Sequence, residues 1–176
     1  MLRFCTRFLK DKSGLSAIEF GLLLPVMITS YFGVAEIGSF ILADRKATAV
    51  ASTAADLAAQ STQISNAGMA DIMASLNTII MPFTPSDLQI RITSVTANAT
   101  GVTTVAWSDA VRTSPRAVGS SITMPAGLVP ANQSVIMSEV TFKYTSIVGM
   151  FLANGITVTD TFYLKPRKSL AVQRVP

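Results

Sequence analysis

The sequence predicts an α+β protein in which a long N-terminal helix, partly membrane-spanning, packs with a small antiparallel sheet of about four strands. Three observations lead to this fold class. An apolar run fills residues 20–43, an alanine-rich run follows it, and Val, Ile and Thr dominate several short segments of the second half. With 176 residues, the chain can form one modest domain plus a segment outside it.

The apolar run is long enough to cross a membrane as a helix. The hydrocarbon core needs about 20 largely apolar residues, and between Phe20 and Ala43 the only ionisable side chains are Tyr31 and Glu36. The run is too long for a secretory signal peptide, and helix-forming sequence follows it instead of a cleavage site between small residues. Pro25 is expected to kink the helix or loosen one turn, which membrane helices tolerate.

The charges on the two sides of the run predict its orientation. Residues 1–14, which precede it, hold four basic residues and one acid: Arg3, Arg7, Lys10, Lys12 and Asp11. Two basic residues and one acid follow it: Arg45, Lys46 and Asp44. Because positive charge accumulates on the cytoplasmic side of membrane helices, we expect the N-terminus in the cytoplasm and the remaining chain on the far side.

A short motif stands where the basic segment meets the apolar run. Gly14 ends the basic segment and Glu19 follows five residues later. Cleavage after Gly14 would give Leu15 an ammonium group, and Glu19 could pair with the ammonium of a neighbouring subunit, since acids in membrane helices usually have partners. Ser16 and Glu19 also form a capping box, which would satisfy amides at a helix start without any processing. The basic segment favours processing, and the two interpretations are compatible in a precursor.

This N-terminal segment resembles that of TadE-like proteins, the pseudopilins of tight-adherence (Flp-type) pili. The positions that match the family pattern, in order, are Gly14, Glu19-Phe20, Leu24-Pro25, Glu36 and Gly38. Ser39 departs from the pattern, because the family often has Arg there, and Arg45 or Lys46 could replace that charge. Residues 105–108 and 138–146 show a weaker, mostly compositional likeness.

The resemblance implies a membrane-anchored, minor pilin-like subunit of a type IVc pilus, active in pilus biogenesis, secretion and surface adhesion. It implies cleavage between Gly14 and Leu15 by a prepilin-type peptidase, and pairing with other pilin or pseudopilin subunits. The positions expected to serve this pairing are Glu19, Phe20, Pro25 and Glu36. The implied location is the bacterial inner membrane, with a periplasmic C-terminal domain. The alternative is an unprocessed single-pass protein whose periplasmic domain binds a secreted partner or a surface polymer.

The chain is expected to divide into four parts. These are a basic leader (1–14), a transmembrane helix (15–43), an alanine-rich extension with a second short helix (44–87), and a β domain (88–176). Small residues recur every fourth position along the first helix: Ala35, Ser39, Ala43, Ala47, Ala51, Ala55 and Ala59. Such a row favours close packing, either with another subunit's helix or with this chain's own sheet.

The later elements follow from periodicity and turn residues. A second helix is expected after Ser65, because apolar residues recur at helical spacing and Pro82 ends the pattern. These apolar residues are Met69, Ile72, Met73, Leu76 and Ile80. Strands are expected at 88–97, 101–108, 134–148 and 155–165, with a hairpin turn at 98–101 and a long loop at 109–133.

Several functional classes find no support in the sequence. The chain has no His and a single Cys, so it lacks the commonest general base, the commonest metal ligand and any intrachain disulfide. We find no nucleophile elbow and no phosphate-binding loop, and expect no catalytic residues, metal or cofactor. The net charge of +4 is scattered, so nucleic-acid binding is not expected. Isolated acids (Asp109, Glu139, Asp160) and the basic tail (Lys165, Arg167, Lys168, Arg174) are expected to be solvated, with a docking patch as the alternative for the tail.

Overall fold

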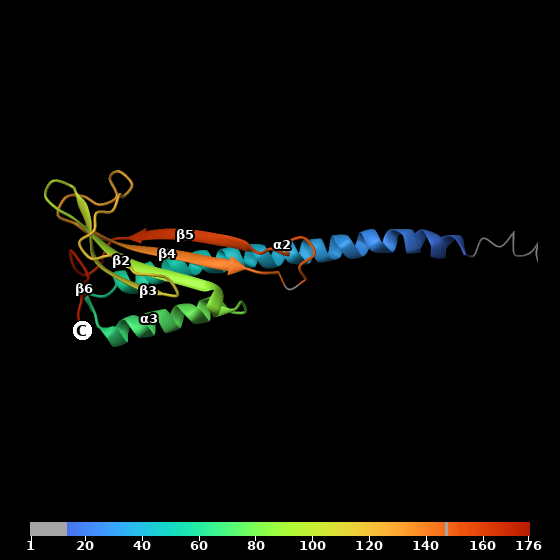
Figure 1. The fold of residues 1–176 in the computed structure, drawn as a ribbon, viewed down its shortest axis with the longest axis horizontal. Helices are drawn as coiled ribbons and strands as arrows, with labels where there is room; N and C mark the ends of the chain where they lie inside the picture. Colours follow the sequence, from blue (N-terminus) through green and yellow to red (C-terminus); the bar gives the residue numbers. More distant parts are fainter. Residues whose placement is uncertain (1–13, 147) are drawn as a thin grey trace, which may run out of the picture.

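A helix of 45 residues, α2 (Leu15–Ala59), dominates the computed structural model, which describes residues 14–146 and 148–176. The N-terminal part of α2 projects away from the domain, and its C-terminal part lies along the sheet (Figure 1). Apart from Gly14, the predicted leader lies outside the described residues. The helix therefore passes without interruption from the apolar run into the alanine-rich run.

A four-stranded antiparallel sheet forms the second layer of the domain. Its strands are β2 (Leu88–Ala97), β3 (Thr103–Val111), β4 (Ser134–Tyr144) and β5 (Ile156–Leu164), in the spatial order β3-β2-β4-β5. β2 pairs with two neighbours, so that Ile90 lies opposite Val111 on one side and Val140 on the other. A long apolar helix with this sheet confirms the predicted α+β class.

The hairpin between β2 and β3 forms where the sequence predicts a turn. The Asn98 side-chain oxygen accepts hydrogen bonds from the amides of Thr100 (3.0 Å) and Val102 (2.9 Å). Gly101 has φ +80°, a backbone conformation that glycine adopts without strain. Because this turn uses residues through Val102, β3 begins two residues later than expected and extends to Val111, so that the first residues of the predicted loop belong to β3.

The second helix, α3 (Asn66–Ile79), also follows the sequence prediction. Ser65 is its N-cap, and the Ser65 hydroxyl accepts a hydrogen bond from the amide of Gly68 (3.1 Å). The helix buries Met69, Met73 and Leu76, which belong to the same core as α2 and the sheet. The predicted apolar face of this helix is therefore confirmed.

Alanines of α2 and larger side chains of the sheet form the core. Seven alanines of α2 are completely buried: Ala43, Ala47, Ala51, Ala54, Ala55, Ala58 and Ala59. The sheet contributes branched and aromatic side chains to the same core, among them Ile90, Val140 and Phe142. Because alanine ends at its β-carbon, the helix backbone can approach the sheet closely while the sheet supplies the bulk.

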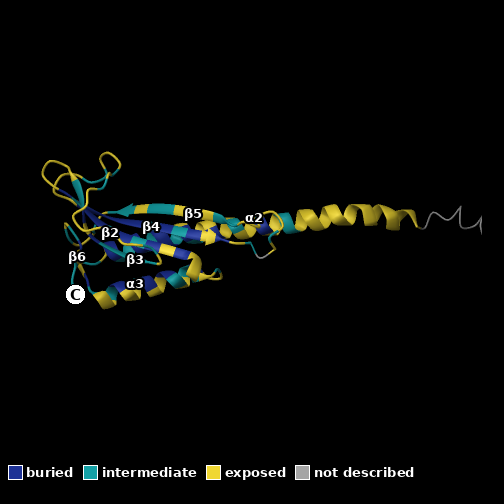
Figure 2. Ribbon diagram, viewed as in Figure 1, coloured by how far each residue is buried: buried dark blue, intermediate teal, exposed yellow. Residues whose placement is uncertain are grey.

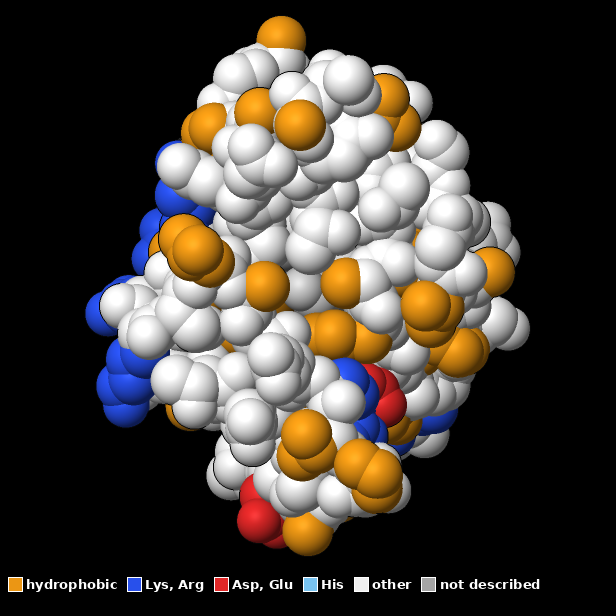
Figure 3. Space-filling view, turned by 90° about the vertical axis from the view of Figure 1, so that its left-hand side faces the viewer, with side chains coloured by type: hydrophobic (Ala, Val, Ile, Leu, Met, Phe, Trp, Pro, Cys, Tyr) orange, Lys and Arg blue, Asp and Glu red, His pale blue; other side chains and the backbone are white. Residues whose placement is uncertain are grey.

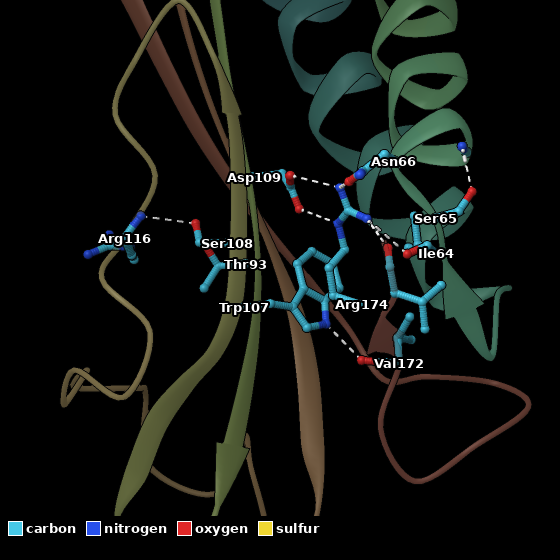
Figure 4. Close-up of polar contacts among 12 residues, drawn as sticks. Ile64, Ser65, Asn66, Thr93, Trp107, Ser108, Asp109, Arg116, Val172 and Arg174 are labelled. Atoms are coloured by element: carbon cyan, nitrogen blue, oxygen red, sulfur yellow. Dashed lines mark hydrogen bonds and ion pairs between the residues drawn. The ribbon is translucent and has the colours of Figure 1, made fainter.

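The C-terminal tail is docked on the domain, and the expectation of a solvated tail is wrong for Arg174, which is partly buried, whereas Arg167 stays exposed. The residues Gln173–Arg174 form β6, which pairs in parallel with β1 (Gln63–Ile64) directly after α2. Arg174 forms an ion pair with Asp109 (2.9 Å), and its guanidinium also donates to the Ile64 carbonyl (3.1 Å; Figure 4). Arg167 likewise pairs with Asp56 of α2.

Two more contacts around the tail and the sheet also differ from the sequence expectation. The Trp107 indole on β3 donates to the Val172 carbonyl (2.7 Å), which holds the segment before β6 (Figure 4). On the sheet, Glu139 pairs with Arg91 (3.2 Å) and with Arg116 of the long loop (2.7 Å). Asp109 and Glu139 are thus partly buried ion-pair partners rather than solvated acids, because distant segments carry the matching cations.

Replacing Ala51 by leucine should destabilise the domain. Ala51 has no exposed surface, and added methylenes in a packed core usually cost about 1–3 kcal/mol. Urea unfolding of the full chain in detergent, followed by the fluorescence of Trp107, measures the change. Thr48→Leu is the matched control, since Thr48 lies exposed on the same helix and should shift the free energy of unfolding by less than about 0.5 kcal/mol. Equal effects of the two variants would contradict the alanine packing.

Candidate functional site

The N-terminal part of α2 is exposed (Figure 2), and it carries many large apolar side chains whose contact with water is unfavourable. Its exposed large side chains are Leu15, Ile18, Phe20, Leu22, Leu23, Leu24, Val26, Met27, Ile28, Tyr31 and Val34. An apolar surface of this extent marks a site of membrane or protein contact. Among the described residues, α2 is the one helix long and apolar enough to cross a membrane, and its most apolar stretch has no residue buried in the domain.

Gly14 is exposed at the start of this helix. It is the N-cap of α2, and its carbonyl accepts a hydrogen bond from the amide of Ile18 (3.1 Å). A β-carbon at Gly14 would meet no atom within 4 Å. Ser16 lies inside the helix and no side chain caps its start, so the capping box considered from the sequence does not form.

Glu19 lies one turn into the helix with its side chain exposed. None of the ion pairs within residues 14–146 and 148–176 involves Glu19. Phe20 beside it is also exposed. Gly14, Glu19 and Phe20 therefore share the end of the helix that projects away from the domain, and all three are exposed in the described part of the chain.

Pro25 does not interrupt the helix. Helical geometry continues through it to Ala59, and the Thr29 hydroxyl donates to the Pro25 carbonyl (2.7 Å) one turn later. Membrane helices tolerate an internal proline when neighbouring side chains bond to the backbone groups that the proline leaves unpaired.

Glu36 is the buried charge of the apolar run, with 2% of its surface exposed. One carboxylate oxygen accepts a hydrogen bond from the amide of Phe151 (2.8 Å), in the loop between β4 and β5. The other oxygen is buried and has no hydrogen-bond partner in the described part of the chain. It adjoins a cavity of about 350 Å³ that Ser39, Phe83 and Tyr144 help to line. Glu36 thus contacts its own domain, while its pairing with another subunit stays a prediction.

The row of small residues divides into two parts. Ala35 and Ser39 are exposed. The members from Ala43 onward, which are Ala43, Ala47, Ala51, Ala55 and Ala59, are fully buried in the core shared with the sheet. Of the two partners considered from the sequence, the chain's own sheet covers this later part, and only Ala35 and Ser39 remain available to another helix.

The described residues show no cluster of side chains suited to catalysis or to metal binding. Within them, no group of three or more Cys, Asp or Glu side chains is close enough to hold a metal ion. Asp56, Asp109 and Glu139 are engaged with arginines, whereas Asp160 forms no ion pair with the described residues. The absence of enzymatic activity stays a prediction.

In the part of the chain that the structure describes, one exposed apolar helix continues into a small α+β domain, an arrangement that suggests membrane anchoring. The family model described as TadE-like protein matches residues 14–56, from the helix N-cap almost to the end of α2. This match confirms the resemblance inferred from the sequence over the helix. Comparisons with curated proteins and with solved structures return no match to the chain.

Replacing Glu36 by alanine should loosen the loop between β4 and β5. The amide of Phe151 would lose its acceptor, so its hydrogen exchange should accelerate while the amides of β2 and β4 keep their protection. Glu36→Gln retains a side-chain carbonyl and should preserve part of the protection. Glu19→Ala serves as the control and should leave the loop unchanged. Unaltered exchange at Phe151 in Glu36→Ala would contradict the contact.

Proposed function

We propose that the chain is a minor pilin-like subunit, a pseudopilin, of a tight-adherence type IVc pilus. In this role it is anchored in the bacterial inner membrane with its N-terminus cytoplasmic and its domain periplasmic, and takes part in pilus biogenesis and surface adhesion. The observation that carries the proposal is the free end of α2, where Gly14 and Glu19 lie exposed at the start of an apolar helix that matches the TadE-like family. The role is one of assembly and needs no catalytic group.

Processing after Gly14 fits the local structure. Gly14 is exposed, so a prepilin-type peptidase in the membrane could reach the bond to Leu15. The helix begins at Leu15, so removal of the leader would leave α2 whole. The new ammonium at Leu15 would then stand one turn from Glu19, at the end of the helix where an acidic side chain is also favoured by the helix dipole.

The membrane around Glu19 would favour its pairing with an opposite charge on a neighbouring subunit. An acid within a membrane is unfavourable by about 2.5–3.5 kcal/mol at the helix centre, and less near an end, unless it finds a partner. The exposed Glu19 has no ion pair with described residues of its own chain, and the ammonium of Leu15 on a neighbouring subunit supplies the opposite charge. Such a pair would set the axial register of two adjacent helices.

Replacing Gly14 by valine should block removal of the leader. A side chain at this position meets no atom within 4 Å, so the fold should be unaffected and only the peptidase should be hindered. Mass spectrometry of the N-terminus in cells that make the pilus is the measurement, and the natural protein should begin at Leu15. Gly21→Val is the matched control, since Gly21 is equally unobstructed, and it should be processed normally.

An intact leader on the natural protein would contradict the processing step. Normal pilus assembly by an unprocessed Gly14→Val protein would instead favour the single-pass alternative, in which the β domain binds a secreted partner or a surface polymer.

Replacing Glu19 by alanine should reduce assembly without affecting processing or folding. The side chain is exposed and forms no ion pair with described residues of its own chain, so its loss removes only the proposed intermolecular pair. Crosslinking of the processed subunit to other pilins in membranes measures the effect. Asp44→Ala, an exposed acid beyond the apolar run, should crosslink as the natural protein does. Equal crosslinking of all three proteins would exclude a role for Glu19 in pairing.

A further inference from the structure

We propose that the loop between β4 and β5 seats the domain on the membrane by placing Val148, Met150 and Phe151 among the lipids of the outer boundary. The proposal rests on the membrane span of α2 and is independent of processing and of pilus assembly. The surface that α2 presents to lipid would then continue onto the domain itself, and the partner is the lipid bilayer.

The loop is apolar and exposed, which is unusual for a connection between two strands. Val148, Met150 and Phe151 are 46%, 48% and 56% exposed. Residues 145–155 contain no charged side chain. Exposure of these three apolar side chains to water is unfavourable, whereas their transfer into lipid is favourable. The composition of the loop therefore fits a lipid environment.

The position of the loop along α2 sets its depth. The Phe151 ring lies against Gly33, since a β-carbon at Gly33 would stand 3.1 Å from Cε2 of that ring. Gly33 follows Leu15 by 18 residues, which corresponds to about 27 Å of helix at 1.5 Å per residue. The hydrocarbon core is about 30 Å thick. A span that begins at Leu15 therefore brings the loop to the outer edge of the hydrocarbon, and a span that begins later brings it deeper.

The inner end of the span cannot move far toward the N-terminus. Lys10, Asp11 and Lys12 precede Gly14 in the unprocessed chain, and the ammonium of Leu15 would take their place after processing. Charged groups of either kind do not enter the hydrocarbon readily. The contact between Gly33 and Phe151 consequently holds the loop within reach of lipid for every placement that keeps these charges outside. The depth of the loop follows from the covalent chain and from this one contact.

The polar backbone of the loop has partners that suit such a location. Backbone amides near hydrocarbon need internal acceptors, because water is scarce there. The Phe151 amide donates to Glu36 (2.8 Å), and the Gly149 amide donates to the Ser146 hydroxyl (3.2 Å). The Gly155 amide donates to the Leu152 carbonyl (3.0 Å). Glu36 thereby acts as a positioning residue that fixes the loop to the helix.

The opposite end of the domain has a different surface. Figure 3 shows that end with scattered apolar side chains among polar ones and with lysines and arginines at its side. Val118 in the long loop is exposed, and its neighbour Gly119 donates a hydrogen bond to Val105 near the start of β3. The loop between β4 and β5, by contrast, places exposed apolar side chains beside the exposed helix.

Fluorescent labels on single cysteines test the proposal. The full chain, with Cys5→Ser to remove the native thiol, is placed in phosphatidylcholine vesicles at a high lipid-to-protein ratio. Phe151→Cys and Met150→Cys carry an environment-sensitive dye, and doxyl groups on the lipid chains act as quenchers. Val26→Cys on the exposed helix is the positive control, and Val118→Cys at the far end of the domain is the negative control.

The expected result is a blue-shifted emission and a loss of fluorescence at positions 150 and 151 comparable with those at 26. The dye at 118 should keep an aqueous emission without quenching. Labels at 150 and 151 that behave like the label at 118 would overturn the proposal. Shielding from water without doxyl quenching would also overturn it, since the occupant would then be protein. Absence of quenching at 26 would instead refute the membrane span and with it the proposed function.

Discussion

The alanine face of α2 and the sheet approach each other so closely that seven alanine side chains retain no exposed surface. Since the same helix continues unbroken into the exposed apolar segment, the direction of the domain is fixed by the direction of the segment. A hinge between the membrane and the domain would require that α2 end before the sheet begins, and it does not. The domain should therefore move with its anchor as one body, which suits a subunit whose helix is inserted among others.

Polar contacts hold the two ends of the domain to this core. Near the exposed helix, Glu36 accepts a hydrogen bond from the loop between β4 and β5. At the far end, Arg174 connects β6 with Asp109 and with the segment after α2. Each contact involves a buried or partly buried charged side chain, so breaking it would leave a buried polar group without that partner. They determine how the ends of the domain are presented to a membrane or to a neighbour.

Local patterns in the sequence predicted much of the fold. The helical spacing before Pro82 indicated α3, and Asn98 with Gly101 indicated the hairpin, because these signals act within a few residues. Contacts between distant segments have no such signal. Nothing near Arg174 identifies Asp109 as its partner, and nothing near Glu36 identifies Phe151. The row of small residues indicated close packing, but periodicity alone did not choose between the chain's own sheet and another helix.

The central claim is that one rigid helix serves both as the membrane segment and as the backbone of the domain. Spin labels placed one at a time along residues 20–50 of the full chain in bilayers test it most directly. The account predicts access to oxygen dissolved in lipid around the helix up to about Gly33. Beyond that point it predicts that access varies with the period of a helix and is lowest at the buried positions Ala43 and Ala47. The helical pattern should continue without interruption from the lipid-exposed segment into the domain. A mobile, water-accessible stretch between Gly33 and Ala43 would contradict it.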